Sequence, residues 1–132
     1  MKNPFAIFFK TQIKPLPQKV IHALETNFPG AMNVEWEHKK SGFEAIFYLN
    51  DVEHISLFSG KGILLENKKN LWPNEIPENI AAVCNSKGEI MNGIVINRGD
   101  KLFYEVIIRD TNLNRYLLLF EPNGTLLKTE KL

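Results

Sequence analysis

Residues 27–50, NFPGAMNVEWEHKKSGFEAIFYLN, constrain the fold more than any other part of this chain. Apolar and polar side chains alternate over residues 32–38 and again over residues 43–49, a pattern typical of half-buried β-strands. The polar residues 39–42 between the two runs end in glycine, which predicts a hairpin turn. The stretch therefore predicts two consecutive antiparallel strands.

The alternation also predicts which side chains share a face of the sheet. On the first strand, one face carries Met32, Val34 and Trp36. On the second strand, one face carries Phe43, Ala45, Phe47 and Leu49, and the other carries Glu44, Ile46 and Tyr48. On a third strand, we expect Glu53, Ile55 and Leu57 to lie beside the face of Glu44, Ile46 and Tyr48. Both faces carry apolar residues, so either one could be covered by helices.

The remaining elements follow from the same kind of pattern. Residues 15–28 have apolar side chains at every fourth position, as in an amphipathic helix, and Pro29–Gly30 ends it. Further strands are expected at residues 52–58 and 63–65, before a polar linker at residues 66–70. In the second half, a shorter helix opens at Ile76–Pro77, and strands are expected at about residues 89–97, 101–109, 115–120 and 125–127.

The two halves of the chain look like copies of one unit. Leu16–Pro17 matches Ile76–Pro77, and Phe43–Ala45 matches Tyr104–Val106. The expected repeats span about residues 15–66 and 75–130 of a single domain, residues 1–132, with residues 1–14 as an N-terminal arm. Each copy has one helix and several strands, and we expect the two copies to share one core. The predicted class is α+β, with the helices packed on one face of the sheet.

Composition excludes several classes of function. The 132 residues carry a formal net charge of +1, so no overall field favours nucleic acid or an anionic membrane. No stretch reaches the roughly 20 apolar residues of a membrane span. The first residues lack a full apolar core and a cleavage site, so we predict no signal peptide and, for the chain as written, a cytoplasmic location.

Cysteine and histidine residues that could act as nucleophiles or metal ligands are few in this sequence. The single cysteine, Cys84, falls on the apolar stripe of the second helix and is interpreted as a small buried apolar residue. The three histidines, His22, His38 and His54, have no spacing that preassembles metal ligands. We therefore expect no catalytic residue, no cofactor and no metal. An enzymatic alternative would require His54 and Glu44 to meet across neighbouring strands.

The helix followed by FPGAMNVEWE, FEAIFYLN and SGKGILLE resembles the PepSY-like domains related to beta-lactamase inhibitory protein. The resemblance extends over roughly residues 15–128. It implies tandem helix-plus-antiparallel-sheet units in a family whose members are mostly exported. Its inhibitory members lay a sheet face against an enzyme, so the resemblance also implies a role in protein binding.

These observations favour a non-enzymatic binding module that contacts a protein partner, as an inhibitor does, through an open sheet face. The candidate contact residues are Ile46, Tyr48 and Trp72. One alternative is a carrier of small apolar ligands with a pocket lined by Phe43, Phe47 and Trp36. A homo-oligomer that pairs through an exposed edge strand is compatible with the binding module.

Overall fold

The computed structural model describes residues 15–132, which form one antiparallel sheet with two α-helices and a short 3-10 helix. The strands are β1 (Met32–Lys39), β2 (Gly42–Leu49), β3 (Val52–Phe58), β4 (Leu64–Leu71), β5 (Glu89–Arg98), β6 (Lys101–Arg109), β7 (Arg115–Phe120) and β8 (Leu126–Lys131). The helices are α2 (Gln18–Asn27), η1 (Pro73–Glu75) and α3 (Glu78–Asn85). Each strand pairs with the next one along the chain, which confirms the predicted α+β class. The arm predicted at residues 1–14 lies outside the described residues.

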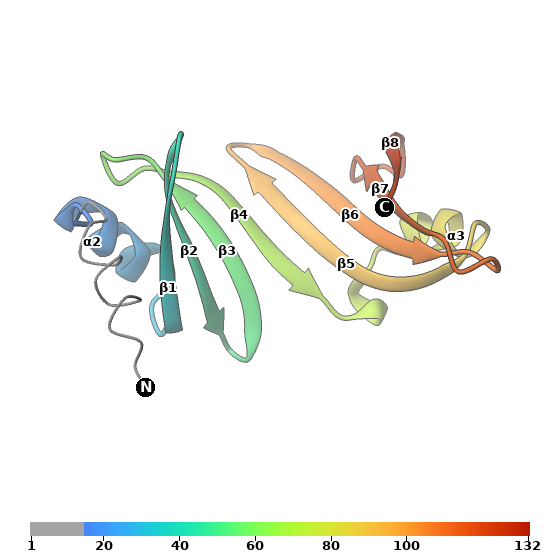
Figure 1. The fold of residues 1–132 in the computed structure, drawn as a ribbon, viewed down its shortest axis with the longest axis horizontal. Coiled ribbons are helices and arrows are strands. Elements are labelled where there is room, and N and C mark those ends of the chain that lie inside the picture. Colours follow the sequence, from blue (N-terminus) through green and yellow to red (C-terminus); the bar gives the residue numbers. More distant parts are fainter. Residues whose placement is uncertain (1–14) are drawn as a thin grey trace, which may run out of the picture.

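Both α-helices cover the same face of the sheet, one near each end (Figure 1). Paired residues on neighbouring strands point to the same side. One such row runs through Phe47, His54, Lys69, Val95, Tyr104 and Phe120. Its first residue packs with α2 and its last with α3. We call this side the helix-covered face and the opposite side the helix-free face.

The buried apolar side chains form two clusters rather than the single shared core that the repeat predicted. In one cluster, Val20 and Leu24 of α2 pack with Phe47 and other residues of β2 and β3. In the other, Ile80 of α3 packs with Val106 and other residues of β6 and β7. Each helix therefore closes its own end of the sheet, and the strands between them continue from one end to the other.

Strand β1 departs from simple alternation. Met32 pairs with Tyr48 and Glu35 pairs with Ile46, so three steps along β1 match two steps along β2. Asn33 lies in this bulge with a φ of +54°, a conformation that asparagine tolerates better than most residues. The prediction that Met32 shares a face with Val34 and Trp36 is therefore wrong. The bulge turns Met32 to the helix-free face, where 64% of its surface is exposed.

The polar linker predicted at residues 66–70 is also wrong, because these residues lie within β4. Their polar side chains have partners on neighbouring strands. Glu66 accepts a hydrogen bond from Arg98 Nε at 2.7 Å, and Asn67 Oδ1 accepts one from Ser56 Oγ at 2.6 Å. Such partners allow a polar segment to occupy the middle of a sheet. β8 likewise begins at Leu126 and runs beyond the predicted end at residue 127, to Lys131.

Candidate functional site

The helix-free face of β2 and β3 is the one that carries Ile46 and Tyr48. Ile46 pairs with Ile55 and Tyr48 with Glu53, so these side chains point to the same side. The alternate residues of β2, such as Phe47, are buried against α2. The predicted grouping of side chains on these two strands is confirmed, and the register decides which group the helices cover.

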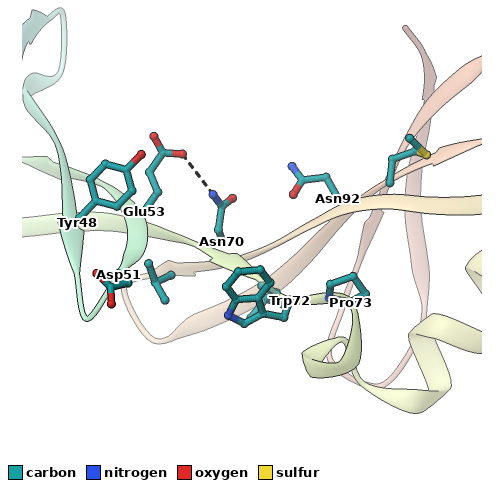
Figure 2. Close-up of a pocket in the computed structure, with 10 residues that line it drawn as sticks. Tyr48, Asp51, Glu53, Asn70, Trp72, Pro73 and Asn92 are labelled. Carbon is teal, nitrogen blue, oxygen red and sulfur yellow. Dashed lines mark hydrogen bonds between the residues drawn. The ribbon is translucent and has the colours of Figure 1, made fainter.

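A hollow of about 330 Å³ opens at the edge of the sheet, beside the β2–β3 turn and the segment that follows β4. Its lining residues come from β2, β3, β4 and β5 and from the segments that adjoin them. Figure 2 shows Tyr48 and Trp72 on two sides of it, with Glu53 and Asn70 between them. Its remaining lining residues are Asp51, Val52, Leu71, Pro73, Met91 and Asn92. We call this feature the edge hollow. It joins residues that are more than forty positions apart in the chain.

Local backbone structure holds the walls of the edge hollow in place. The β2–β3 turn consists of Asn50 and Asp51, whose φ angles of +52° and +64° suit a tight two-residue hairpin. On the other wall, the Trp72 backbone N–H donates to Glu75 Oε1 at 2.8 Å. The Glu75 backbone N–H in turn donates to the Trp72 carbonyl at 2.8 Å. Trp72 is therefore fixed at its backbone while its side chain stays exposed.

Four large apolar side chains surround or adjoin the edge hollow and remain open to solvent. Their exposed fractions are 64% for Met32, 43% for Tyr48, 65% for Trp72 and 38% for Met91. Tyr48, Trp72 and Met91 line the hollow, and Met32 pairs with Tyr48. We call these four residues the apolar rim. Large exposed apolar groups that gather at one place are typical of contact surfaces.

The three predicted contact residues have different positions. Tyr48 and Trp72 meet at the edge hollow, although they are twenty-four positions apart in the sequence. Ile46 lies on the same face, two residues along β2, and is half-buried outside the hollow lining. Met32, Met91 and Asp51 were missed. Met32 depends on the bulge at Asn33, and no local pattern in the sequence brings Met91 to Tyr48.

The edge hollow is also electrostatically one-sided. Asp51 and Glu53 line it, and none of its ten lining residues is a lysine, arginine or histidine. Glu53 Oε1 accepts a hydrogen bond from Asn70 Nδ2 at 3.2 Å, which orients its carboxylate. Within residues 15–132, the ion pairs include neither Asp51 nor Glu53. The hollow therefore combines apolar walls with uncompensated negative charge.

The middle of the helix-free face is more closed than its edge. Ile96 is only 3% exposed, although its position on β5 faces away from both helices. Its paired neighbours are Lys68 on β4 and Phe103 on β6. Arg98 lies over the Phe103 ring at 5.5 Å from the centroid and also pairs with Glu66. Flanking side chains thus shield the centre of this face. Of the eight large apolar side chains that are exposed within residues 15–132, four lie in or beside the edge hollow.

The histidine–carboxylate pair of the enzymatic alternative does not form. His54 pairs with Phe47 on the helix-covered face, whereas Glu44 pairs with Leu57 on the other face. The His54 ring stacks on Phe47 at 5.2 Å, and its Nδ1 lies 3.4 Å from Asn67 Oδ1. Burial lowers the pKa of His54, against the opposing effect of its hydrogen bond to Asn67. His54 is therefore a packed side chain whose burial favours the neutral ring.

Neither the cysteine nor the possible metal-ligating side chains form a reactive or metal-binding site within residues 15–132. Cys84 is fully buried, and burial raises the pKa of its thiol to about 11, which disfavours the thiolate. No group of three or more possible metal-ligating side chains comes together within residues 15–132. No helix in that part is long and apolar enough to cross a membrane.

The pocket expected for an apolar ligand has a different lining from the one predicted. Phe43 and Phe47 are buried in the cluster that packs against α2, and Trp36 is partly buried at the edge of that cluster. Trp36 does line an open groove of about 510 Å³ between α2 and β1, together with Leu24 and Phe28.

No protein-family model and no curated protein matches the sequence, but solved structures match the fold. A DUF2874 family protein from Bacteroides uniformis has a TM-score of 0.78 at 24% identity, over 87% of this chain and 88% of its own. A protein from Bacteroides eggerthii, named as a candidate periplasmic protein, has a TM-score of 0.78 at 21% identity. The match covers 89% of this chain and 90% of that protein. A BLIP-like protein from Bacteroides fragilis has a TM-score of 0.79 at 18% identity. The match covers 94% of this chain and 92% of that protein. The chain therefore has the fold of BLIP-like proteins, which confirms that part of the predicted resemblance.

Proposed function

We propose that this chain is a non-enzymatic module that binds a protein partner through its helix-free face, with the apolar rim at the centre of the contact. One observation carries this proposal. Four large apolar side chains from β1, β2, β5 and the segment after β4 are exposed together around one hollow. Their exposure serves no packing purpose within the described chain.

The composition of the rim suits a protein contact. Aromatic residues and methionine are enriched in protein interfaces, and tyrosine and tryptophan contribute a large share of the binding energy. Tyr48 and Trp72 supply two such side chains, held by a tight hairpin and by the Glu75 hydrogen bond. Ile46 extends the surface inward along β2. Because the walls are fixed before binding, little conformational freedom is lost on contact.

The structural neighbours support the same proposal from another direction. One of them is named as BLIP-like, and the segments FPGAMNVEWE and FEAIFYLN resemble PepSY-like domains. We extend that kinship to this chain and infer that inhibition of an enzyme is one form its binding takes. The candidate periplasmic neighbour suggests an exported protein, in place of the cytoplasmic location first expected. We also infer that residues 15–66 and 75–130 arose by duplication of one helix-plus-sheet unit.

The test is affinity capture with three versions of the immobilised chain. The wild type is compared with the double variant Tyr48→Ala/Trp72→Ala and with Ile63→Ala. Ile63 is 57% exposed in the β3–β4 turn, at the opposite end of the strands, so its loss is a matched control. We expect the wild type and Ile63→Ala to retain the same partner, and the double variant to bind it at least about tenfold more weakly.

Equal retention by the double variant would contradict the proposal, provided that its circular dichroism spectrum matches the wild type. Light scattering on each eluate separates a foreign partner from a second copy of the chain, which could pair through the exposed edge of β1 or β8. An apolar small molecule extracted from the purified chain, with no protein captured, would instead favour the groove between α2 and β1.

A further inference from the structure

The edge hollow carries a charge pattern that the proposed function leaves unexplained. Several carboxylates of the sheet have cationic partners: for example, Glu66 Oε2 lies 2.7 Å from Arg98 Nε, and Glu89 Oε1 lies 3.0 Å from Arg109 Nη2. Asp51 and Glu53 have no such partner among residues 15–132. They share one hollow, whose ten lining residues include no positively charged side chain.

The walls of the hollow suit a particular kind of group. Tyr48 and Trp72 bring aromatic rings to it, and Met91 adds an apolar side chain. Aromatic faces attract cations, and the attraction is stronger for tryptophan than for tyrosine or phenylalanine. The volume of about 330 Å³ is at the lower end of the range of roughly 300–1,000 Å³ for ligand pockets, which favours one side chain over a larger ligand.

We infer that the edge hollow receives a lysine or arginine side chain of the protein partner, held between Trp72 and Tyr48 and neutralised by Glu53 and Asp51. This inference rests on the proposed protein-binding function and adds the chemistry of the group that is recognised. A neutral occupant would cover two carboxylates without compensating their charge, at a cost in desolvation. A cation supplies that compensation, and its alkyl stem packs on the apolar rim.

The Glu53 carboxylate is the best-placed counter-charge. Asn70 Nδ2 donates to its Oε1 at 3.2 Å, which leaves its other oxygen free for a ligand. Asp51 lies at the neighbouring tip of the β2–β3 hairpin and adds a second negative charge to the same hollow. Glu53→Gln removes the charge and replaces the carboxylate oxygen with an amide oxygen that can also accept the Asn70 hydrogen bond, so this variant keeps the local structure.

The experiment is a nuclear magnetic resonance titration of the full chain that follows the indole N–H signal of Trp72, assigned with the variant Trp72→Phe. The probes are N-acetylarginine amide and its neutral isostere, N-acetylcitrulline amide, at matched ionic strength. We expect a saturable shift with the arginine probe and none with the citrulline probe. Glu53→Gln should weaken binding of the arginine probe about fivefold. The control Glu105→Gln removes a charge from the same face outside the hollow and should leave the affinity unchanged.

Equal shifts with both probes, or no saturable shift with the arginine probe, would overturn the inference. The same variants in the capture assay separate this failure from failure of the proposed function. If Glu53→Gln binds the partner with the wild-type affinity while Tyr48→Ala/Trp72→Ala loses it, protein binding stands and recognition of a cation is overturned. If the arginine probe binds and the double variant still retains the partner, the hollow is a cation site and the proposed protein contact is wrong.

Discussion

Strand β2 presents two different surfaces from consecutive residues, and the contrast explains how the chain separates stability from recognition. Phe43, Ala45 and Phe47 point to the helix-covered face and are buried against α2. Ile46 and Tyr48 point to the opposite face, where no helix of the described chain lies. Both sides are apolar enough to serve as a core. The helices decide which side stabilises the fold, and the other side is left available for a partner.

The largest expected effect comes from truncating the two adjacent aromatic residues of β2. Phe47 is fully buried, so Phe47→Ala should lower the free energy of unfolding by about 3–5 kcal/mol. Tyr48→Ala, one residue further on, should lower it by less than about 1 kcal/mol, because 43% of Tyr48 is already exposed. Urea denaturation followed by circular dichroism measures both. Similar losses for the two variants would contradict the division of the sheet into two faces.

Strand β5 offers a second adjacent pair. A Cβ atom on Gly93 would lie 2.8 Å from Ile76 Cδ1, beneath the segment that leads into α3. Gly93→Ala should therefore destabilise the protein by about 1–3 kcal/mol through overpacking. Asn92→Ala, at an exposed position lining the edge hollow, should stay within about 0.5 kcal/mol of the wild type. Thermal and urea unfolding of the two variants are the measurements. A large loss of stability for Asn92→Ala would mean that the lining of the edge hollow has a structural role.

A third comparison uses pH. Burial lowers the pKa of His54 in the folded state below its unfolded value, so the unfolded state takes up the proton first. The stability associated with the neutral ring is complete above the unfolded pKa of about 6.5 and is lost as the pH falls toward the folded pKa. The slope should reach at most about 1.4 kcal/mol per pH unit.

The control for this effect is His54→Phe, which keeps an aromatic ring against Phe47 and cannot titrate. Urea denaturation of both proteins between pH 7 and pH 5 should give a smaller pH dependence for the variant, with pH values chosen around the histidine pKa. Identical pH dependence for the two proteins would show that His54 does not contribute to it.

The smallest expected effect is on stability at Trp72. Trp72→Ala should change the free energy of unfolding by no more than about 0.5 kcal/mol, because 65% of the side chain is exposed. The fluorescence should differ more clearly. The variant Trp36→Phe retains only Trp72 and should be quenched readily by acrylamide, whereas Trp72→Ala retains only the half-buried Trp36 and should be quenched less. The reverse order of quenching would place Trp72 inside the protein.

These comparisons also show how far the sequence alone could predict the molecule. Alternation identified β1, β2 and β3, and the spacing of Leu16, Val20 and Leu24 identified α2, because both patterns depend on local geometry. Residues 66–70 were assigned to a linker because none of them is apolar. Their place inside β4 depends on partners such as Arg98 and Ser56, which come from other strands. Long-range hydrogen bonds of this kind leave no local pattern.

The candidate site was predictable only in part for the same reason. Tyr48 and Trp72 could be selected as aromatic residues at exposed positions, but the strand order brings them to one hollow. Met32 was assigned to the wrong face because one bulged residue, Asn33, reverses the alternation. Met91 also follows a change of register, between Ile90 and Asn92. Two of the four residues of the apolar rim, Met32 and Met91, therefore owe their positions to bulges in β1 and β5.

The most direct test of binding through the helix-free face is hydroxyl-radical footprinting of the chain alone and in complex with the partner recovered by capture. Oxidation is read by mass spectrometry at Met32, Tyr48, Trp72 and Met91, with Ile63 as the reference at the opposite end of the strands. We expect the four rim residues to be protected in the complex while Ile63 is oxidised as before. Unchanged oxidation of the rim, with protection of α2 or α3 instead, would show that the partner binds the helix-covered side and would contradict the proposed function.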